Sequence, residues 1–347
     1  MCRLGLVLLL VACGRTDRDQ PDRAEAGPTL KAQPHRTFTG HAEAGRQLAF
    51  SPDGQVLATS SVDRTVKLWQ VSDGKILRTL THPEGVTSIA FSPDGQWLAS
   101  GCYDRTVNVW RLRDGALTRT LTGHGGTVWS VAFSPDGQRL ASGGEDKTVK
   151  VWRMSDGVLV QTLAGHTLNV WSVRFSPDGQ ILASGSFDKT IKLWRADTGA
   201  LMQTLTGPKE AVVSVAFSPD SRWLAGGGDD SAIRLWRVSD GRLMNTLTGG
   251  SDHVYTVAFS PDGEWLASGG RARGGLGTLW HHTFGNHLRR GNGTTVRLWR
   301  VRDGALQQGL AEQADDVGSV DFSPDGRWLA GSSEDGSVTL WSLATSP

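Results

Sequence analysis

The chain has 347 residues, and its 36 Lys and Arg against 35 Asp and Glu leave a formal net charge of only +1. This balance argues against a general nucleic-acid binder, which needs a basic surface. The 14 Trp against 2 Tyr suggest one structural position that is used repeatedly, and 3 Cys are too few for a disulfide-stapled fold.

The first residues have the order of a secretory signal, with Arg3, an apolar run from Leu4 to Ala12, and then Cys13. The run is far short of the ~20 residues that span a bilayer, which excludes a polytopic membrane protein. Leu-Val-Ala-Cys ending at Cys13 resembles the lipobox of bacterial lipoproteins, which implies removal of residues 1–12 and lipidation of Cys13. The alternatives are a plain secreted protein and a cytoplasmic protein with an apolar N-terminus.

The lipobox resemblance also implies a location. The protein is expected at the cell envelope, in contact with the membrane through its lipid anchor only. Such lipoproteins often stay in the inner membrane when Asp follows the Cys, whereas Gly14 here favours the outer membrane where the host has one. Residues 13–34 are polar, charged and dotted with Pro, and are predicted to be the lipidated Cys and a disordered tether.

Residues 35–347 consist of one unit of about 42 residues written seven times. The string FSPDG, once FSPDS, starts at Phe50, Phe91, Phe133, Phe175, Phe217, Phe259 and Phe322. A second marker, an aliphatic residue before Trp, ends at Trp69, Trp110, Trp152, Trp194, Trp236, Trp299 and Trp341.

Each unit is predicted to contain four short antiparallel strands separated by turns that hold Pro, Asp and Gly. In the third unit the strands are expected at Val128 to Phe133, Arg139 to Ser142, Thr148 to Trp152 and Val158 to Leu163. Repeated four-stranded units of this length are typical of propeller blades.

The repeats resemble the WD40 family, although the family's Trp-Asp pair is Trp-Arg in most units, as in Trp152-Arg153. The resemblance implies an all-β fold, a seven-bladed β-propeller. The last unit ends after its third strand, and a fourth-type strand, Arg36 to Phe38, precedes the first unit. We therefore expect the N-terminal strand to complete the last blade and close the ring, which removes its open edge.

Four units carry a His, a Ser or Thr, an Asp and a Trp at matching positions. Ser, His and Asp together suggest a hydrolase. However, a hydrolase needs one nucleophile, whereas this set occurs in four units. Each set also contains a Trp indole donor, which fits a buried hydrogen-bond chain rather than a catalytic triad. We interpret the sets as structural tetrads, as the family resemblance also implies. They are His41, Thr59, Asp63, Trp69; His82, Ser100, Asp104, Trp110; His124, Ser142, Asp146, Trp152; and His166, Ser184, Asp188, Trp194.

The tetrad is incomplete in the last three units, which have Pro208 and Gly250 in place of the His of units five and six. Blades five to seven are therefore expected to be held less tightly. The sequence contains no phosphate-binding loop, nucleophile elbow or zinc-protease motif, and no cofactor is expected. Cys102 replaces a Gly or Ser near a strand end and is interpreted as a packing residue.

Two repeat positions are expected at the mouth of the central channel, where family members with known ligands often bind peptides. Clustered aromatic side chains with a few charges suit a protein or peptide partner, for example one with a basic side chain. The alternative is that some of these rings only pack against neighbouring blades. The candidate partner-binding residues are Tyr103, Trp129, Trp171, Phe187, Tyr255, Glu145, Asp229 and Glu334.

The sixth unit contains an insertion at about residues 271–291, with four Arg and no acid. A Gly-rich mobile loop and a contact with a partner or an anionic surface are both compatible with this composition. His281, His282 and His287 give only a weak metal signal without Cys or carboxylate, so no metal site is predicted. The candidate contact residues are Arg271, Arg273, Trp280, Arg289 and Arg290.

Together these features predict a monomeric, non-enzymatic scaffold at the cell envelope that binds a protein or peptide and no nucleic acid. The first alternative is an envelope enzyme with its active site in the central channel. The second is a cytoplasmic assembly module, which requires that the lipobox be accidental. Fold alone does not decide between these functions.

Overall fold

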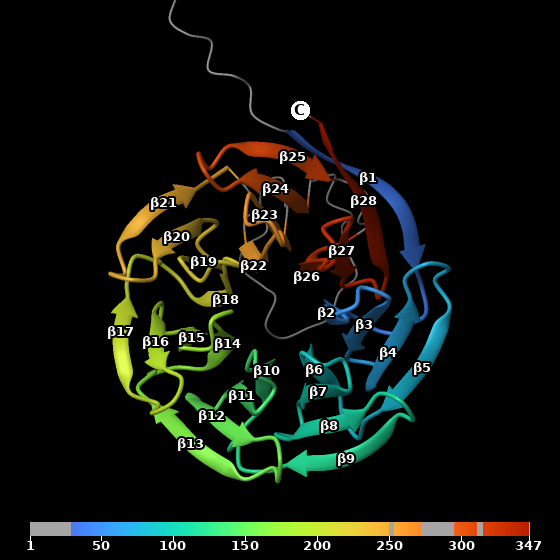
Figure 1. Cartoon of the computed structure of the whole chain (residues 1–347), viewed down its shortest axis with the longest axis vertical. Coiled ribbons are helices and arrows are strands. Elements are labelled where there is room, and N and C mark those ends of the chain that lie inside the picture. The colour runs from blue at the N-terminus through green and yellow to red at the C-terminus, as the bar shows by residue number, and fades with distance from the viewer. Residues whose placement is uncertain (1–28, 250–252, 272–294, 311–314, 347) are drawn as a thin grey trace, which may run out of the picture.

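The computed structural model describes residues 29–249, 253–271, 295–310 and 315–346, and every structural statement below concerns these residues. Seven four-stranded antiparallel sheets stand around a central axis as the blades of a propeller (Figure 1). The predicted all-β, seven-bladed fold is confirmed. In the part of the chain that the structure describes, we find no helix with the length and hydropathy needed to cross a membrane.

The blades share one strand order, from the channel outward. The innermost strands are β2 (Gly45–Phe50), β6 (Val86–Phe91), β10 (Val128–Phe133), β14 (Val170–Phe175), β18 (Val212–Phe217), β22 (His253–Phe259) and β26 (Val317–Phe322). The second strands are β3 (Val56–Ser61), β7 (Trp97–Cys102), β11 (Arg139–Gly144), β15 (Ile181–Ser186), β19 (Trp223–Gly228), β23 (Trp265–Arg271) and β27 (Trp328–Ser333).

The third strands are β4 (Thr65–Gln70), β8 (Val107–Arg111), β12 (Thr148–Arg153), β16 (Ile191–Arg195), β20 (Ile233–Arg237), β24 (Val296–Arg300) and β28 (Val338–Ser346). The outer strands are β5 (Ile76–Thr81), β9 (Ala116–Leu121), β13 (Leu159–Ala164), β17 (Leu201–Leu205), β21 (Leu243–Leu247), β25 (Leu306–Leu310) and β1 (Thr29–Phe38). In the third blade the strands lie where the sequence placed them, apart from small shifts at their ends.

The Ser-Pro-Asp-Gly turn explains why each blade folds back at the same point. In the third blade the Gly137 amide donates to the Ser134 carbonyl at 2.8 Å, and the Gln138 amide donates to Asp136 Oδ1 at 3.0 Å. Gly137 has φ +68°, a left-handed conformation that glycine adopts without a steric penalty. The repeated turn therefore sets the strand register in every blade.

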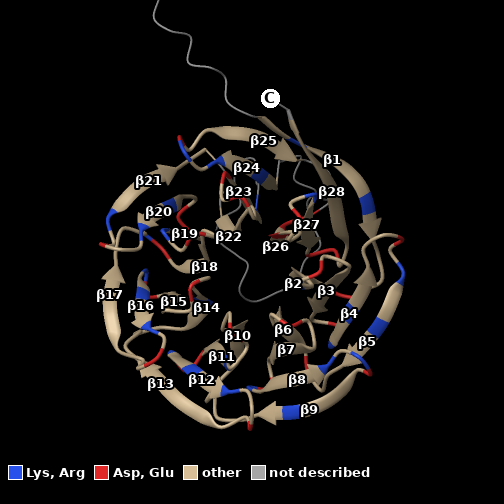
Figure 2. Cartoon of the chain, in the orientation of Figure 1, with Lys and Arg blue, Asp and Glu red and all other residues tan. Residues whose placement is uncertain are grey.

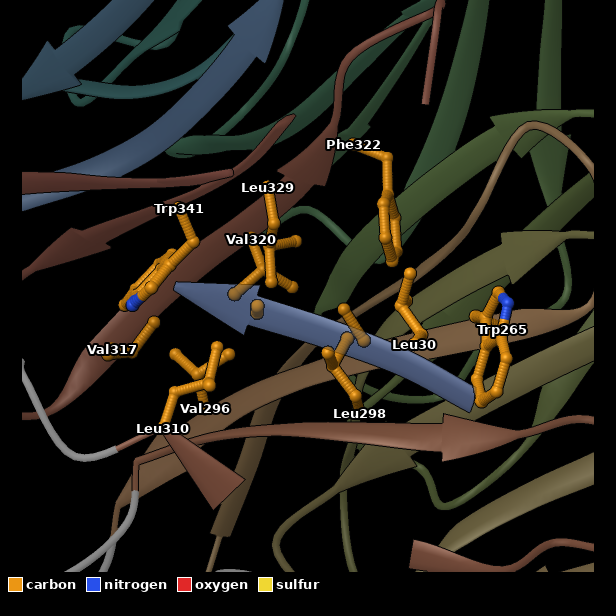
Figure 3. Packing of buried hydrophobic residues seen from close by; sticks show 12 residues of the cluster. Leu30, Trp265, Val296, Leu298, Leu310, Val317, Val320, Phe322, Leu329 and Trp341 are labelled. Carbon is orange, nitrogen blue, oxygen red and sulfur yellow. The ribbon is translucent and has the colours of Figure 1, made fainter. Parts of the chain in front are cut away.

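The hydrophobic core lies between neighbouring blades rather than inside one blade. In one cluster, Val149 and Leu163 of the third blade pack with Val170 and Trp194 of the fourth blade. Figure 3 shows the corresponding cluster around Trp341 and Trp265, into which Leu30 projects from β1. Each blade thus depends on its neighbours, as in other repeat proteins.

The N-terminal strand closes the ring as predicted. Strand β1 pairs with β28 from Thr29 opposite Ser346 to Phe38 opposite Val338. The predicted end of the tether at residue 34 is wrong, because residues 29–34 already belong to this strand. Beyond blade 7, the Ala32 amide donates to Gln308 Oε1 at 2.9 Å, and Gln308 Nε2 donates to the Ala32 carbonyl at 3.0 Å. The strand therefore also binds blade 6.

Candidate functional site at the central channel

The structure confirms the predicted tetrad in the first, third and fourth blades. In the fourth blade, Trp194 Nε1 donates to Ser184 Oγ at 2.8 Å, and Ser184 Oγ lies 2.7 Å from His166 Nε2. His166 Nδ1 lies 2.8 Å from Asp188 Oδ2, which also accepts the Thr167 amide. Ser184 has no exposed surface, so it is no nucleophile for an external substrate.

Electrostatics support a neutral histidine in this tetrad. Burial lowers the pKa of His166, although the hydrogen bond to Asp188 opposes the shift. A neutral ring then donates from Nδ1 to Asp188 and accepts the Ser184 hydroxyl proton at Nε2. The chain of bonds fixes the loop before the blade to the turn between its second and third strands.

The predicted tetrad of the second blade is incomplete. His82 Nε2 bonds Ser100 Oγ at 2.8 Å, but His82 Nδ1 is buried without a partner, and Asp104 bonds Thr106 instead. In the complete tetrads the Asp also accepts the amide of the residue after the His. Pro83 occupies that position here and has no amide proton to donate. Burial lowers the pKa of His82 to about 4.

Blades 5 and 6 lack the tetrad histidine but retain some of the hydrogen bonds of the tetrad. In blade 5, Asp230 Oδ2 accepts the Lys209 amide at 2.7 Å and pairs with Arg234 Nη1 at 2.8 Å, and both charged side chains are buried. In blade 6, Trp299 Nε1 still donates to Ser268 Oγ at 2.9 Å. In blade 5, which lacks the histidine, Asp230 thus binds the preceding loop through the Lys209 amide and pairs with Arg234.

Four of the predicted partner-binding residues form one continuous aromatic group, the aromatic half of the channel mouth. Trp129 and Trp171 are stacked, with ring centroids 4.4 Å apart and an angle of 12°. Tyr103 meets Trp129 edge-on at 5.7 Å, and Phe187 meets Trp171 edge-on at 5.0 Å. All four are half-buried and line the channel, so they contact one another and still face the opening.

Blades 5 to 7 supply the charged half of the mouth. Its residues are Asp229, His253, Tyr255, Arg271, Asp316 and Glu334.

Five members of the charged half contact another member. Tyr255 stacks on His253 at 5.9 Å, and His253 Nδ1 lies 3.2 Å from Asp229 Oδ1. Arg271 Nε pairs with Asp316 Oδ2 at 2.6 Å. Burial raises the pKa of Tyr255 to about 12, so its hydroxyl remains protonated.

Glu145 is exposed beside the mouth and does not line the channel, and its contact with a partner stays a prediction. Its side chain folds back so that Oε2 accepts the Thr127 amide at 3.1 Å. Arg271 of the insertion does reach the mouth, where it binds Asp316. Cys13 and the other named insertion residues, Arg273, Trp280, Arg289 and Arg290, lie outside the described residues.

Two carboxylates of the charged half, those of Asp316 and Glu334, and the carboxylate of the adjacent Asp315 lie within 4.8 Å of one another. Burial raises the pKa of Glu334, and the neighbouring Asp316 carboxylate adds to this shift. The bonded Arg271 guanidinium already compensates Asp316. This group is therefore suited to a cationic side chain rather than assigned to a metal.

Sequence analysis missed two charged residues deeper in the channel, Arg174 of β14 and Asp321 of β26. The channel has a volume of about 900 Å³, and all seven blades line it. The available signal was a departure from the repeat, since both residues stand where the other units have Ala directly before FSPDG or FSPDS.

The remaining surface is mixed in charge. Figure 2 shows Lys and Arg interspersed with Asp and Glu around the ring.

The comparisons with known proteins agree with this architecture. The family model "WD domain, G-beta repeat" matches residues 32–70, 74–111, 115–153, 157–195, 199–237, 241–280 and 305–342. The chain therefore belongs to the WD40-repeat proteins, whose propellers typically act as protein-interaction scaffolds.

Individual relatives match over single stretches of repeat. The chain is 44% identical over 64 residues to the Coronin-like protein of Saccharomyces cerevisiae, which covers 18% of this chain and 10% of that protein. It is 38% identical over 72 residues to Protein Mut11 of Chlamydomonas reinhardtii, covering 19% and 20%. It is 38% identical over 52 residues to Ribosome assembly protein 4 of Saccharomyces cerevisiae, covering 15% and 10%. The chain thus spans at most a fifth of the length of these three relatives.

Proposed function

We propose that this propeller is a non-enzymatic scaffold that binds a protein or peptide partner at the mouth of its central channel. The observation that carries the proposal is the division of the mouth. Four contacting aromatic side chains from blades 2 to 4 face a group of charged side chains from blades 5 to 7. Aromatic anchors beside charged groups are typical of the residues that dominate binding energy in protein interfaces.

The two halves favour a partner segment with an apolar residue next to a basic one. The apolar side chain packs on the Trp171 and Phe187 rings, which are half-buried and already held by each other. The basic side chain meets the carboxylates of Asp229 and Glu334. Because the rings are pre-arranged, little side-chain entropy is lost when the partner binds.

Affinity capture with matched variants tests this proposal. Wild-type protein, the double variant Trp129→Ala with Trp171→Ala, and Glu145→Ala are each immobilised and exposed to an extract of the source cells. Glu145 is the control because it is exposed near the mouth but outside the channel. We expect proteins captured by the wild type and by Glu145→Ala to be lost from the double variant. Equal capture by all three would contradict binding at the mouth.

We further propose that a lipid on Cys13 holds the propeller at the cell envelope. The order of residues before Cys13 supports this proposal. Residues 14–28 separate that Cys from strand β1 and extend to at most about 50 Å, so the propeller would lie close to the membrane. Metabolic labelling with a fatty acid should mark the wild type and leave Cys13→Ala unmarked and in the soluble fraction. Labelled, membrane-bound Cys13→Ala would contradict the anchor.

A further inference from the structure

One repeat position inside the channel carries opposite charges in two blades. It is the residue directly before the FSPDG or FSPDS string. Five blades have the small apolar residue that leaves the channel open: Ala49, Ala90, Ala132, Ala216 and Ala258. Blade 4 has Arg174 and blade 7 has Asp321 at the same position. At this position the channel is therefore lined by five alanines and by two side chains of opposite charge.

The two charged residues stand on opposite sides of the channel. Their strands, β14 and β26, face each other across the centre of the ring (Figure 1). Both side chains line the channel, whose volume of about 900 Å³ is ample for a small molecule. They lie farther along their strands than Trp171 and Gly318, which line the mouth, so this layer is distinct from the partner site proposed above.

Neither charge is neutralised by direct contact. Arg174 Nη1 donates to its neighbour, the Val173 carbonyl, at 2.9 Å and lies 3.4 Å from Ser130 Oγ. Asp321 Oδ2 accepts the Phe50 amide at 3.1 Å across the junction of blades 7 and 1. Among the ion pairs of the described residues, neither side chain takes part in one. A guanidinium and a carboxylate thus face the same space without touching each other.

Stability does not account for these charges. Burial raises the pKa of Asp321 to about 6 and lowers the pKa of Arg174, so desolvation outweighs the attraction between the two charges. Buried charges that are not in close contact cost stability relative to small apolar residues. Residues that lower stability are characteristic of positions kept for function.

We propose that the channel binds a small zwitterion, with its carboxylate on Arg174 and its protonated amine on Asp321. An anion alone would be repelled by Asp321, and a cation alone would be repelled by Arg174. A molecule that carries both charges satisfies both side chains through charge-assisted hydrogen bonds, and the guanidinium suits a carboxylate in particular. Free amino acids and short peptides share this chemistry.

The test is calorimetric titration of the full chain with amino acids whose charges are progressively farther apart. The probes are glycine, β-alanine, γ-aminobutyrate, ε-aminohexanoate and the peptide triglycine. We expect affinity to peak at one charge separation, which distinguishes a free amino acid from a peptide as the better ligand. Methyl esterification of the carboxylate or acetylation of the amine of the best probe should weaken binding at least about tenfold.

Matched variants locate the site. Arg174→Ala introduces the residue that five other blades carry, and Asp321→Asn retains an oxygen that accepts the Phe50 amide. Each variant should weaken the binding of the best probe at least about tenfold. The control Arg222→Ala changes an exposed residue outside the channel and should leave the binding of this probe unchanged. The proposal is overturned if no probe binds, or if both channel variants bind as the wild type does. Partner capture at the mouth is measured separately, so failure here leaves that result intact.

Discussion

Blades 1 to 4 and blades 5 to 7 share one apolar framework but differ in their polar residues. Both groups keep the Trp of the third strand, buried as Trp152 in blade 3 and as Trp236 in blade 5. Only the first group has the histidine tetrad, complete in three blades and partial in the second. The difference teaches that packing between blades is required everywhere, whereas the polar connection to the loop is replaceable.

The same division runs through the channel mouth. The regular blades 2 to 4 supply the aromatic half, and the divergent blades 5 to 7 supply the charged half. The divergent blades contain other contacts, the Arg234–Asp230 ion pair in blade 5 and the long β1–β28 pairing in blade 7. Blades 5 to 7 thus differ from the other blades in the charged side chains at the mouth, while the ring of blades stays closed.

The largest effect is expected from removal of the strand that closes the ring. Deletion of residues 14–28 should leave the melting temperature unchanged, because strand β1 begins at Thr29. Deletion of residues 14–41 removes β1 and the first tetrad histidine, and should cause a severe loss of stability with aggregation through the exposed edge of β28. Deletion of residues 14–34 should cause an intermediate loss of stability, since it removes only the half of β1 that pairs with Trp341 to Ser346 of β28.

Thermal melting and light scattering measure these differences. Equal melting of all three truncations would show that β1 does not close blade 7.

Removal of a framework Trp should be the next largest effect. Trp152→Ala should lower the free energy of unfolding by about 3–5 kcal/mol, because its buried indole fills the space between blades 2 and 3. Trp171→Ala at the half-buried mouth should cost clearly less, since the channel admits water there. Urea denaturation distinguishes the two, and equal losses would mean that the aromatic half is simply part of the core.

Loss of a tetrad carboxylate should have a smaller effect that depends on the blade. Asp146 accepts hydrogen bonds from His124 and from the Gly125 amide, so Asp146→Ala should cost about 1–3 kcal/mol. Asp104 has no bond to His82, so Asp104→Ala should cost less. Denaturation of both variants measures the contrast. If Asp104→Ala is the more destabilising, the tetrad account of blade 2 fails.

The last effect concerns pH, and it has opposite signs at His82 of blade 2 and Asp321 of blade 7. Burial lowers the pKa of His82 from 6.5 to about 4, so its contribution to stability is lost as pH falls through this range. Burial raises the pKa of Asp321 from 3.8 to about 6, so its contribution is lost as pH rises from about 4 through 6.

Unfolding free energies measured by urea denaturation between pH 4 and pH 8 test both signs. His82→Gln should flatten the decline at acid pH, and Asp321→Asn should become more stable relative to the wild type as pH rises. Each slope is at most about 1.4 kcal/mol per pH unit. Slopes of the reverse sign would refute the assignment of neutral His82 or of buried Asp321.

The fold was predictable because each unit repeats the same local chemistry. The turn, Ser-Pro-Asp-Gly in six units and Ser-Pro-Asp-Ser in the fifth, and the Trp position fix strand order and register seven times. The unpaired strand at Arg36 indicated closure. Side-chain direction was less predictable. Glu145 occupies a rim position in the repeat, yet its long side chain bends back to a nearby amide. Pro83 is visible in the sequence. Its effect on the tetrad depends on a hydrogen bond from the backbone amide after the His to the Asp, and only the complete tetrads of the structure show this bond.

The central claim, that the channel mouth binds the partner, is tested most directly by site-specific photo-crosslinking. A photoreactive residue is placed at Val213, which lines the mouth between its two halves, or at Leu201, which is exposed on the outer strand β17. After irradiation in the source cells, we expect a protein adduct from Val213 that is absent from Leu201 and lost when Trp129 and Trp171 are also replaced by Ala. An adduct from Leu201 with none from Val213 would contradict the account.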